Sequence, residues 1–308
     1  MFYITGDTHG NFGRIDKFCR INKTTRDDVM VILGDAGINY YLGLRDDLNK
    51  RIISALPITL FCVHGNHEQR PYAIDTYEEI KWRGGTVYVE KEYPSILFAK
   101  DGEIYDFGGK SVMVIGGAYS VDKPYRLAFN HAWFSNEQPS DEIKAYVEQQ
   151  LEKANWQVDV VLSHTVPIKY EPVEEFIDGI DQSSVDKSTE IWLGEIESKL
   201  NYDRWYAGHY HTSKQVDKLT IMFEDYREFD TGDLLSKVPT VGQPRYRTEQ
   251  YVSFGWDGKI REGYIEVVDE WGGGFYYKEQ PTYDISVPAE NGTWYKHVPE
   301  EFVIELID

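Results

Sequence analysis

Cysteine, positive charge and long hydrophobic runs are scarce in this sequence of 308 residues. Its two cysteines, Cys19 and Cys62, are too few for a disulfide framework, and they are expected to be small buried residues rather than metal ligands. No run approaches the roughly 18 consecutive apolar residues of a membrane span, so we expect no membrane partner. The 32 basic and 52 acidic residues give a net charge of −20, which excludes proteins that bind long nucleic acids through a basic surface.

We expect no leader segment for secretion either. The first hydrophobic run occupies residues 1–5, with no basic segment and apolar stretch before it, so the expected location is the cytoplasm. What the sequence does have is 41% hydrophobic residues, which is enough to bury a large core. The length allows one large domain, or one domain with an appendage.

Short apolar runs alternate with helical patterns in the N-terminal part of the chain. The runs lie at residues 1–5, 29–33 and 58–63, and apolar residues at helical spacing lie between them, at 12–19 and 46–56. This βαβαβ pattern predicts a largely parallel sheet. In such sheets, ligands bind beyond the carboxyl ends of the strands.

Each of these three runs is followed by polar residues flanked by glycine. Asp7 and His9 follow the first run, Asp35 follows the second, and Asn66 and His67 follow the third. Carboxylate oxygens and imidazole nitrogens suit a borderline divalent metal, so a metal site at this edge of the sheet is one interpretation. For Asp7 and His9 taken alone, the capping of a turn is the alternative.

Shorter β segments follow from residue 84. Residues 85–90, 95–107 and 110–117 are typical of strands, and a turn is expected at 101–102. Together they predict hairpins of a second sheet.

Three more histidines follow predicted elements in the next part of the chain. A helix is predicted at about 140–154, and a strand after it ends at His164. Further along, His209 and His211 have the alternating spacing of a strand. Residues 218–226 are predicted to form a closing strand.

The polar residues after the predicted strands fall into five short blocks. In chain order they are GDTHG at 6–10, GDAG at 34–37, GNHE at 65–68, SH at 163–164 and GHYH at 208–211. This ordered set resembles the calcineurin-like metallophosphoesterase superfamily, from residue 1 to about residue 228, and five of the eight histidines fall inside it.

The resemblance implies an α/β fold, a four-layer α/β/β/α sandwich of two packed mixed β-sheets flanked by helices, with a β-rich C-terminal extension. Residues 1–228 would form the catalytic domain and residues 229–308 the extension. The implied cofactors are two divalent metal ions, and a hydroxide that bridges them would attack the phosphorus in line. Their implied ligands are Asp7, His9 and His211 at one metal, Asn66, His164 and His209 at the other, and Asp35 as the bridge. The lack of thiolate ligands favours manganese, iron or zinc without ranking them.

His67 matches the position of a protonated imidazole beside the leaving-group oxygen, so the resemblance implies a catalytic role for it. The serine/threonine phosphatases carry an Asp and two Arg residues where this chain has Ile38, Asn39 and His64. Arg70 is therefore a candidate for binding the substrate phosphate, and a solvated surface charge is the alternative. General acid–base help contributes only about 10²- to 10⁴-fold, so we expect these losses to slow catalysis rather than abolish it.

The expected function is hydrolysis of a phosphate ester, a phosphomonoester on a small molecule or a protein. A phosphodiesterase or a dinucleoside polyphosphate hydrolase is the alternative among enzymes. A catalytically silent protein-binding scaffold is the alternative outside them. The long acidic segment at 170–200 is either a lid over the site or an ordinary surface crossover.

The C-terminal residues have a different character. The segment 230–247 predicts a linker, and the chain beyond it is aromatic and β-like, with hairpin-turn pairs at 257–258 and 291–292. These residues predict a small β module or extra strands on the core. Their aromatic side chains are either buried or form a surface for a protein partner.

Overall fold

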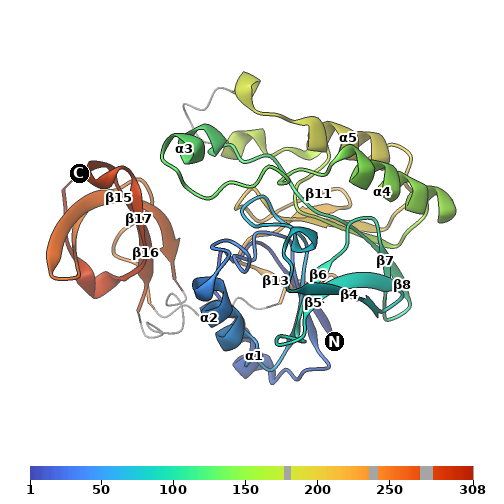
Figure 1. Ribbon diagram of the computed structural model, residues 1–308, viewed down its shortest axis with the longest axis horizontal. Coiled ribbons are helices and arrows are strands. Elements are labelled where there is room, and N and C mark those ends of the chain that lie inside the picture. Colours follow the sequence, from blue (N-terminus) through green and yellow to red (C-terminus); the bar gives the residue numbers. More distant parts are fainter. Residues whose placement is uncertain (177–181, 236–241, 271–279, 308) are drawn as a thin grey trace. The chain divides into compact units, whose positions relative to one another are not determined.

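The computed structural model describes residues 1–176, 182–235, 242–270 and 280–307, which divide into two compact units (Figure 1). Unit 1 comprises residues 1–9 and 24–236, and unit 2 comprises residues 10–23 and 237–308. The boundary between residues 228 and 229 stays a prediction, although unit 1 extends to Ser236. Within the described ranges, no helix combines the length and apolar character that a membrane crossing needs.

The first sheet of unit 1 has seven strands in the order β13-β1-β2-β3-β6-β5-β4. Its four central strands are parallel and nearly all their residues are buried: β1 (Phe2–Thr5), β2 (Val29–Ile32), β3 (Thr59–Cys62) and β6 (Ile96–Ala99). The outer strands are antiparallel: β13 (Tyr226–Glu228), β5 (Gly85–Glu90) and β4 (Tyr77–Trp82). The continuous apolar runs thus form strands buried on both faces, as predicted.

The second sheet of unit 1 has six strands in the order β11-β12-β10-β9-β8-β7. Four of them are parallel: β12 (Leu219–Ile221), β10 (Arg204–Ala207), β9 (Val160–Ser163) and β8 (Lys110–Ile115). The edge strands β11 (Lys214–Val216) and β7 (Ile104–Phe107) are antiparallel. Both sheets of unit 1 are therefore mixed.

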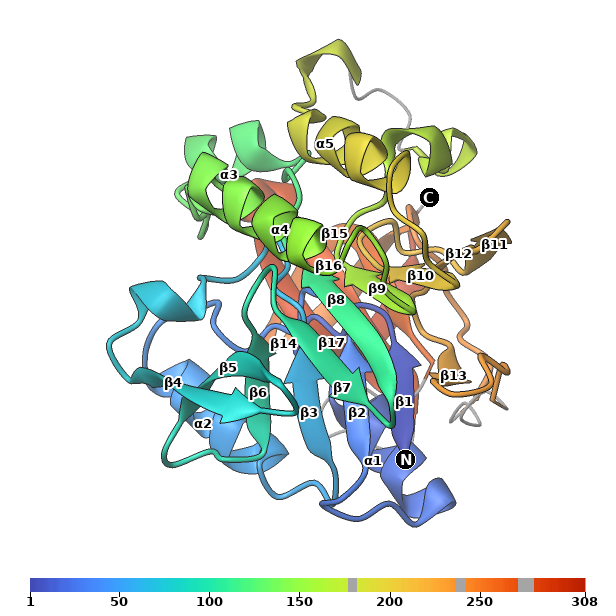
Figure 2. The ribbon, with the colours of Figure 1, turned by 90° about the vertical axis from the view of Figure 1, so that its right-hand side faces the viewer.

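The two sheets share one apolar core, and helices cover their outer sides. Phe61 and Val31 of the first sheet belong to the same buried cluster as Phe107 of the second. Helices α4 (Asp141–Lys153) and α5 (Ser188–Glu197) cover the second sheet, where they bury Leu151 and Trp192 (Figure 2). Helix α2 (Leu44–Ile53) flanks the first sheet through an ion pair of 2.6 Å between Lys50 and Glu90. The predicted α/β/β/α layers are confirmed.

Two predictions about strand pairing are wrong. The turn at 101–102 does not close a hairpin, because β6 pairs in parallel with β3 in the first sheet and β7 belongs to the second. Residues 218–226 do not form one strand, because β12 ends at Ile221 and β13 starts at Tyr226 in the other sheet. Between them, the Phe223 carbonyl accepts a hydrogen bond of 3.0 Å from the amide of Gly6, which holds the chain where it changes sheet.

Unit 2 contains helix α1 (Gly13–Asn22) and an antiparallel sheet in the order β17-β16-β15-β14-β18. The strands are β17 (Thr293–Pro299), β16 (Thr282–Val287), β15 (Lys259–Asp269), β14 (Tyr251–Trp256) and β18 (Val303–Leu306). The predicted turn between β14 and β15 is confirmed, since Asp257 and Gly258 have φ angles of 49° and 71°. Buried Phe254, Ile265 and Tyr283 belong to a core of this sheet, which supports a β module. The β-like residues 272–279 and part of the predicted linker lie outside the described residues.

The remaining helical segments are short. They are α3 (Lys123–Ala128), η1 (Pro71–Ala73), η2 (Ile168–Tyr170), η3 (Val173–Glu175), η4 (Gln182–Ser184), η5 (Pro288–Glu290) and η6 (Glu300–Phe302). The proposed lid segment 170–200 contains η3, η4 and α5, and residues 177–181 within it are outside the described residues.

Candidate metal centre

All seven predicted metal ligands lie just beyond the carboxyl ends of parallel strands in unit 1. They come from five loops: Asp7 and His9 after β1, Asp35 after β2, Asn66 after β3, His164 after β9, and His209 and His211 after β10. The two sheets contribute to the same cluster because their parallel strands end at one edge of the shared core. The topology therefore brings residues 7 and 211 into contact.

The ligand atoms converge into two overlapping groups. One atom from each of Asp7, His9 and His211 lies within 4.8 Å of the others, and the same holds for Asp7, Asp35 and His164. The Nε2 atoms of His9 and His211 are 2.8 Å apart. Asp35 reaches both groups, at 4.0 Å from His9 Nδ1 and 3.7 Å from His164 Nε2. Both carboxylates therefore lie where they can be shared between two cations.

The other two predicted ligands complete the cluster beside His164. The Asn66 Oδ1 atom lies 2.8 Å from His164 Nε2. The ring of His209 lies 5.0 Å from the ring of His164, and its backbone amide donates a hydrogen bond of 3.0 Å to Asp7 Oδ1. The structure thus brings all seven predicted ligands together.

Glycines make this convergence possible. A Cβ atom on Gly34 would lie 2.0 Å from His164 Nδ1, and one on Gly65 would lie 2.0 Å from Asp35 Oδ1. These distances are far below a van der Waals contact, so a methyl group would displace a ligand. The glycines that flank the motifs are required because the ligands of one loop pack against the backbone of another.

Four of the ligands have backbone conformations that are rare for residues with a side chain. The φ angles are 46° at His9, 46° at Asp35, 73° at His209 and 49° at His211. Each such residue costs on the order of 1–3 kcal/mol, and residues of this kind cluster at functional sites. The prediction that His209 and His211 alternate along a strand is wrong, because β10 ends at Ala207 and the two residues lie in the loop beyond it.

The electrostatics of the cluster favour one ionised carboxylate and act on its imidazoles in opposite directions. Burial opposes protonation of His211, but its hydrogen bond to Asp7 and the charge of that carboxylate raise the pKa of His211 above its ordinary value. Burial raises the pKa of Asp35 to about 8, and the neighbouring Asp7 carboxylate adds to the shift. Burial opposes ionisation of Asp7 as well, but its hydrogen bond to His211 and the nearby histidines bring its pKa below the ordinary value. Burial lowers the pKa of His209 to about 3. Neutral imidazole and carboxylate oxygen are the forms that bind divalent metals, so the donor set fits two such ions.

Comparison with known proteins identifies the family. The sequence profile described as calcineurin-like phosphoesterase matches residues 1–213. The chain belongs to the calcineurin-like phosphoesterase family. The family implies metal-dependent hydrolysis of phosphate esters, and the cluster contains Asp and His groups that could hold a divalent metal ion.

Similar solved structures are distant in sequence. The protein TT1561 of Thermus thermophilus is 12% identical, with 77% of this chain and 98% of that chain covered and a TM-score of 0.44. Phosphopantetheinyl hydrolase from Mycobacterium tuberculosis is 12% identical, with 72% and 87% covered and a TM-score of 0.36. The protein of unknown function AQ665 from Aquifex aeolicus is 18% identical, with 56% and 81% covered and a TM-score of 0.30. No curated protein matches the chain.

A buried hydrogen-bond chain orients Asn66 in this phosphoesterase. Asn66 Nδ2 donates to Ser120 Oγ at 2.9 Å, and Ser120 Oγ donates to Glu137 Oε2 at 2.5 Å. Trp133 Nε1 donates to the same oxygen at 2.8 Å. Because the hydroxyl proton of Ser120 is used by Glu137, Ser120 accepts from the amide nitrogen, and Asn66 Oδ1 is left facing the metal ligands. Sequence reasoning missed this chain, since none of the three partners lies in a family block.

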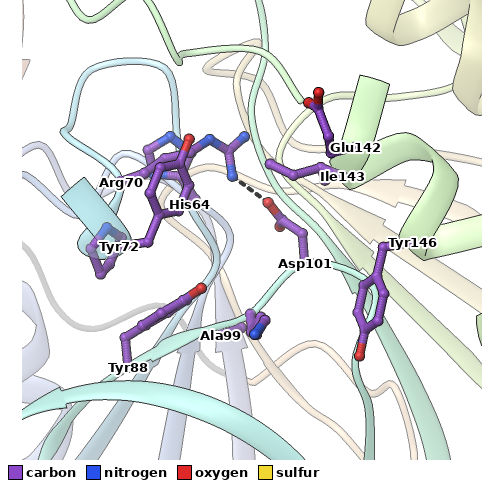
Figure 3. Close-up of a pocket in the computed structure, with 11 residues that line it drawn as sticks. His64, Arg70, Tyr72, Tyr88, Ala99, Asp101, Glu142, Ile143 and Tyr146 are labelled. Atoms are coloured by element: carbon purple, nitrogen blue, oxygen red, sulfur yellow. Dashed lines mark hydrogen bonds and ion pairs between the residues drawn. The ribbon is translucent and has the colours of Figure 1, made fainter. Parts of the chain in front are cut away.

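Arg70 is paired with other groups of the protein. Its Nη1 atom forms an ion pair with Asp101, and its Nε donates to the Asn136 carbonyl at 2.7 Å (Figure 3). The residue is only 3% exposed, so the alternative of a solvated surface charge is wrong. Its role in substrate binding stays a prediction. Position in the chain does not reveal that Asp101, more than thirty residues away, pairs with its guanidinium.

Two other residues of or next to the GNHE block, Glu68 and His64, are also buried. Glu68 is fully buried, and its Oε1 accepts a hydrogen bond of 3.1 Å from the amide of Gly65. His64 lines a pocket of about 170 Å³ together with Arg70, Tyr72 and Tyr88 (Figure 3). Neither ring nitrogen of His64 has a hydrogen-bond partner among the described residues.

Proposed function

We propose that this phosphoesterase hydrolyses phosphate monoesters, on a small molecule or a protein, at a centre of two divalent cations. The observation that carries the proposal is the convergence of seven oxygen and nitrogen ligands from five strand ends, five of which form two groups that share the carboxylate of Asp7. Asp7, His9 and His211 would hold one cation, Asn66, His164 and His209 the other, and Asp35 both. When bound, the cations would polarise the phosphoryl oxygens and acidify water.

A shared carboxylate would also offset the repulsion between the two cations. Two cations at about 3.5–4 Å repel each other, and a shared anionic ligand offsets the repulsion. Asp35 suits this task because it is 2% exposed and His67 donates a backbone hydrogen bond of 2.8 Å to its Oδ1 atom. The backbone contact fixes the carboxylate, so its second oxygen stays directed toward the cluster.

We propose that His67 hydrogen-bonds to the leaving-group oxygen. Its Nε2 atom lies 3.9 Å from Asp35 Oδ2, and its side chain keeps 22% exposure, so a ligand can reach it. Burial and the charge of Arg126 lower the pKa of His67 well below its ordinary value, which favours the neutral ring. A neutral imidazole still donates one N–H, and it gains a full proton only if the bound phosphate dianion raises the pKa.

Turnover of two model esters tests the proposal. We expect hydrolysis of p-nitrophenyl phosphate by protein loaded with manganese, iron or zinc, and a weaker reaction with bis-p-nitrophenyl phosphate. His67→Asn should lower kcat by about 10²- to 10⁴-fold and leave metal binding intact. Faster hydrolysis of the diester would establish the phosphodiesterase alternative. No turnover of either ester with any of the three metals would favour the silent scaffold.

A further inference from the structure

We propose that Arg126, held in place by Tyr40 and Asp122, forms a subsite that binds a phosphate oxygen of the substrate beside the metal centre. The inference deepens the proposed function and rests on it.

The guanidinium of Arg126 is fixed on one side and open on the other. Its Nε donates to Asp122 at 2.6 Å, just before the short helix α3, and its Nη1 donates to Tyr40 Oη at 3.1 Å and to the Ala132 carbonyl at 3.0 Å. Nη2 makes no hydrogen bond to any residue in the described ranges. An oriented fork with free N–H groups matches the oxygens of a phosphate.

The position of Arg126 is set by the loop that carries the bridging carboxylate. Tyr40 belongs to the loop that starts at Asp35, so the hydrogen bond to Tyr40 ties α3 to that loop. The same loop is tied to the GNHE block, because the Asn39 carbonyl accepts a hydrogen bond of 2.9 Å from the amide of Gln69. Arg126 is therefore anchored to the segment that positions Asp35 and runs alongside His67.

The exposure of Arg126 suits this role. The side chain of Arg126 is 15% exposed, which is enough for a ligand to reach it and little enough to limit screening by water.

The net negative charge of the chain makes a fixed positive charge beside the metal centre necessary. With a net charge of −20, the chain repels anionic substrates unless positive charge is concentrated at the site. Arginine meets the need better than lysine because two of its N–H groups can contact two phosphate oxygens at once.

Binding of inorganic phosphate tests the subsite without turnover. The titration uses manganese-loaded full-length protein and compares wild type with Arg126→Gln, Arg126→Lys and Tyr40→Phe. Arg126→Gln should weaken phosphate binding about 10- to 100-fold, because a hydrogen bond to a charged group is lost. Arg126→Lys should restore part of the affinity, and Tyr40→Phe should lower it less than Arg126→Gln. Manganese binding should stay unchanged in all three.

Arg20→Gln is the matched control, since Arg20 also pairs with an aspartate four residues earlier, Asp16, but is 61% exposed. It should leave phosphate binding unchanged. Phosphate binding within twofold of wild type in Arg126→Gln overturns the subsite, as does wild-type protein that binds no phosphate. If Arg126→Gln fails to fold, Tyr40→Phe decides, because unchanged affinity there overturns the proposal. Arg126-dependent phosphate binding in a protein that hydrolyses no ester would refute the proposed function and leave the subsite standing.

Discussion

At the scale of single residues, Asp35 combines an energetic cost to the folded state with a proposed role as a metal ligand. Its carboxyl is buried next to Asp7, and burial raises its pKa to about 8, so the metal-free protein holds it protonated at neutral pH. Asparagine has the same shape and carries no charge. Replacement should therefore remove the cost along with the bridging ligand.

We predict that Asp35→Asn raises the melting temperature of the metal-free protein at pH 8.5 and abolishes the binding of one of two manganese ions. Each kcal/mol gained should raise the melting temperature by about 2–4 °C. Calorimetry of the apoprotein and a manganese titration measure the two effects. A lower melting temperature with two ions still bound would show that Asp35 is not a strained bridging ligand.

Ser120 and Glu137 should act on metal affinity through Asn66, which they orient. We predict that Ser120→Ala or Glu137→Gln weakens the binding of one manganese ion about 10- to 100-fold, the usual effect of losing a partner of a metal ligand. Ser111→Ala is the control, because Ser111 bonds Asp159 at 2.7 Å on β8 and touches no predicted ligand. Unchanged manganese affinity in both variants would mean that the ligand loop alone orients Asn66.

The metal ligands could be predicted from the sequence because each sits in a short block whose spacing is local. Arg126, Ser120 and Glu137 could not, because their roles arise only when β8 and the residues after it pack beside the GNHE loop. The ion pair of Arg70 could not be predicted for the same reason. Its partner Asp101 lies after β6, in the connection between the two sheets, and no local pattern pairs them.

At the scale of elements, the strand ends were predictable and the strand pairings were less so. Buried runs such as 29–33 predict strands because a strand covered on both faces needs uninterrupted apolar residues, and the run is short and rich in β-branched residues. The chain passes from one sheet to the other at residues 101–102 and at 222–225, and this could not be predicted. A turn sequence looks the same whether it closes a hairpin or connects two sheets. The layers were implied by the family resemblance, but the pairing of strands at these points follows from tertiary packing.

The glycine at position 65 should be indispensable to the loop after β3. A Cβ atom there would overlap Asp35 Oδ1 and lie 2.1 Å from the Asp35 amide nitrogen, and backbone cannot move aside cheaply. We predict that Gly65→Ala destabilises the metal-free protein by about 1–3 kcal/mol and weakens manganese binding. Urea unfolding and a manganese titration measure the two losses.

Gly43→Ala is the control for this prediction. Nothing lies within 4 Å of a Cβ atom at Gly43, and its backbone is extended, so alanine fits there. Substitution at this position before α2 should change stability by no more than about 1 kcal/mol. Equal losses in the two variants would show that the loop after β3 adapts, and that the close approach of Gly65 and Asp35 is not a constraint.

At the scale of the whole molecule, several buried carboxyls make the stability of the metal-free protein depend on pH. Burial raises the pKa of Asp35 and of Glu68 to about 8 and that of Glu190 to about 7. The folded protein therefore keeps protons that the unfolded chain has released above about pH 5, and its stability must fall as the pH rises toward 8. Buried histidines such as His209, with a pKa of about 3, have the opposite effect, but only below about pH 6.5.

Metal binding should reverse this dependence, because a cation requires Asp35 in its ionised form. We predict that the melting temperature of the apoprotein falls between pH 6.5 and 8.5, while manganese affinity rises about tenfold per pH unit up to pH 8 as one proton is released. Calorimetric titration in buffers of different ionisation enthalpy counts that proton.

Glu68→Gln separates the two effects. It should make the melting temperature of the apoprotein less dependent on pH and leave the pH dependence of manganese affinity unchanged. A manganese affinity independent of pH between 6.5 and 8 would show that Asp35 is already ionised before the metal binds, and that the histidines around it outweigh its burial.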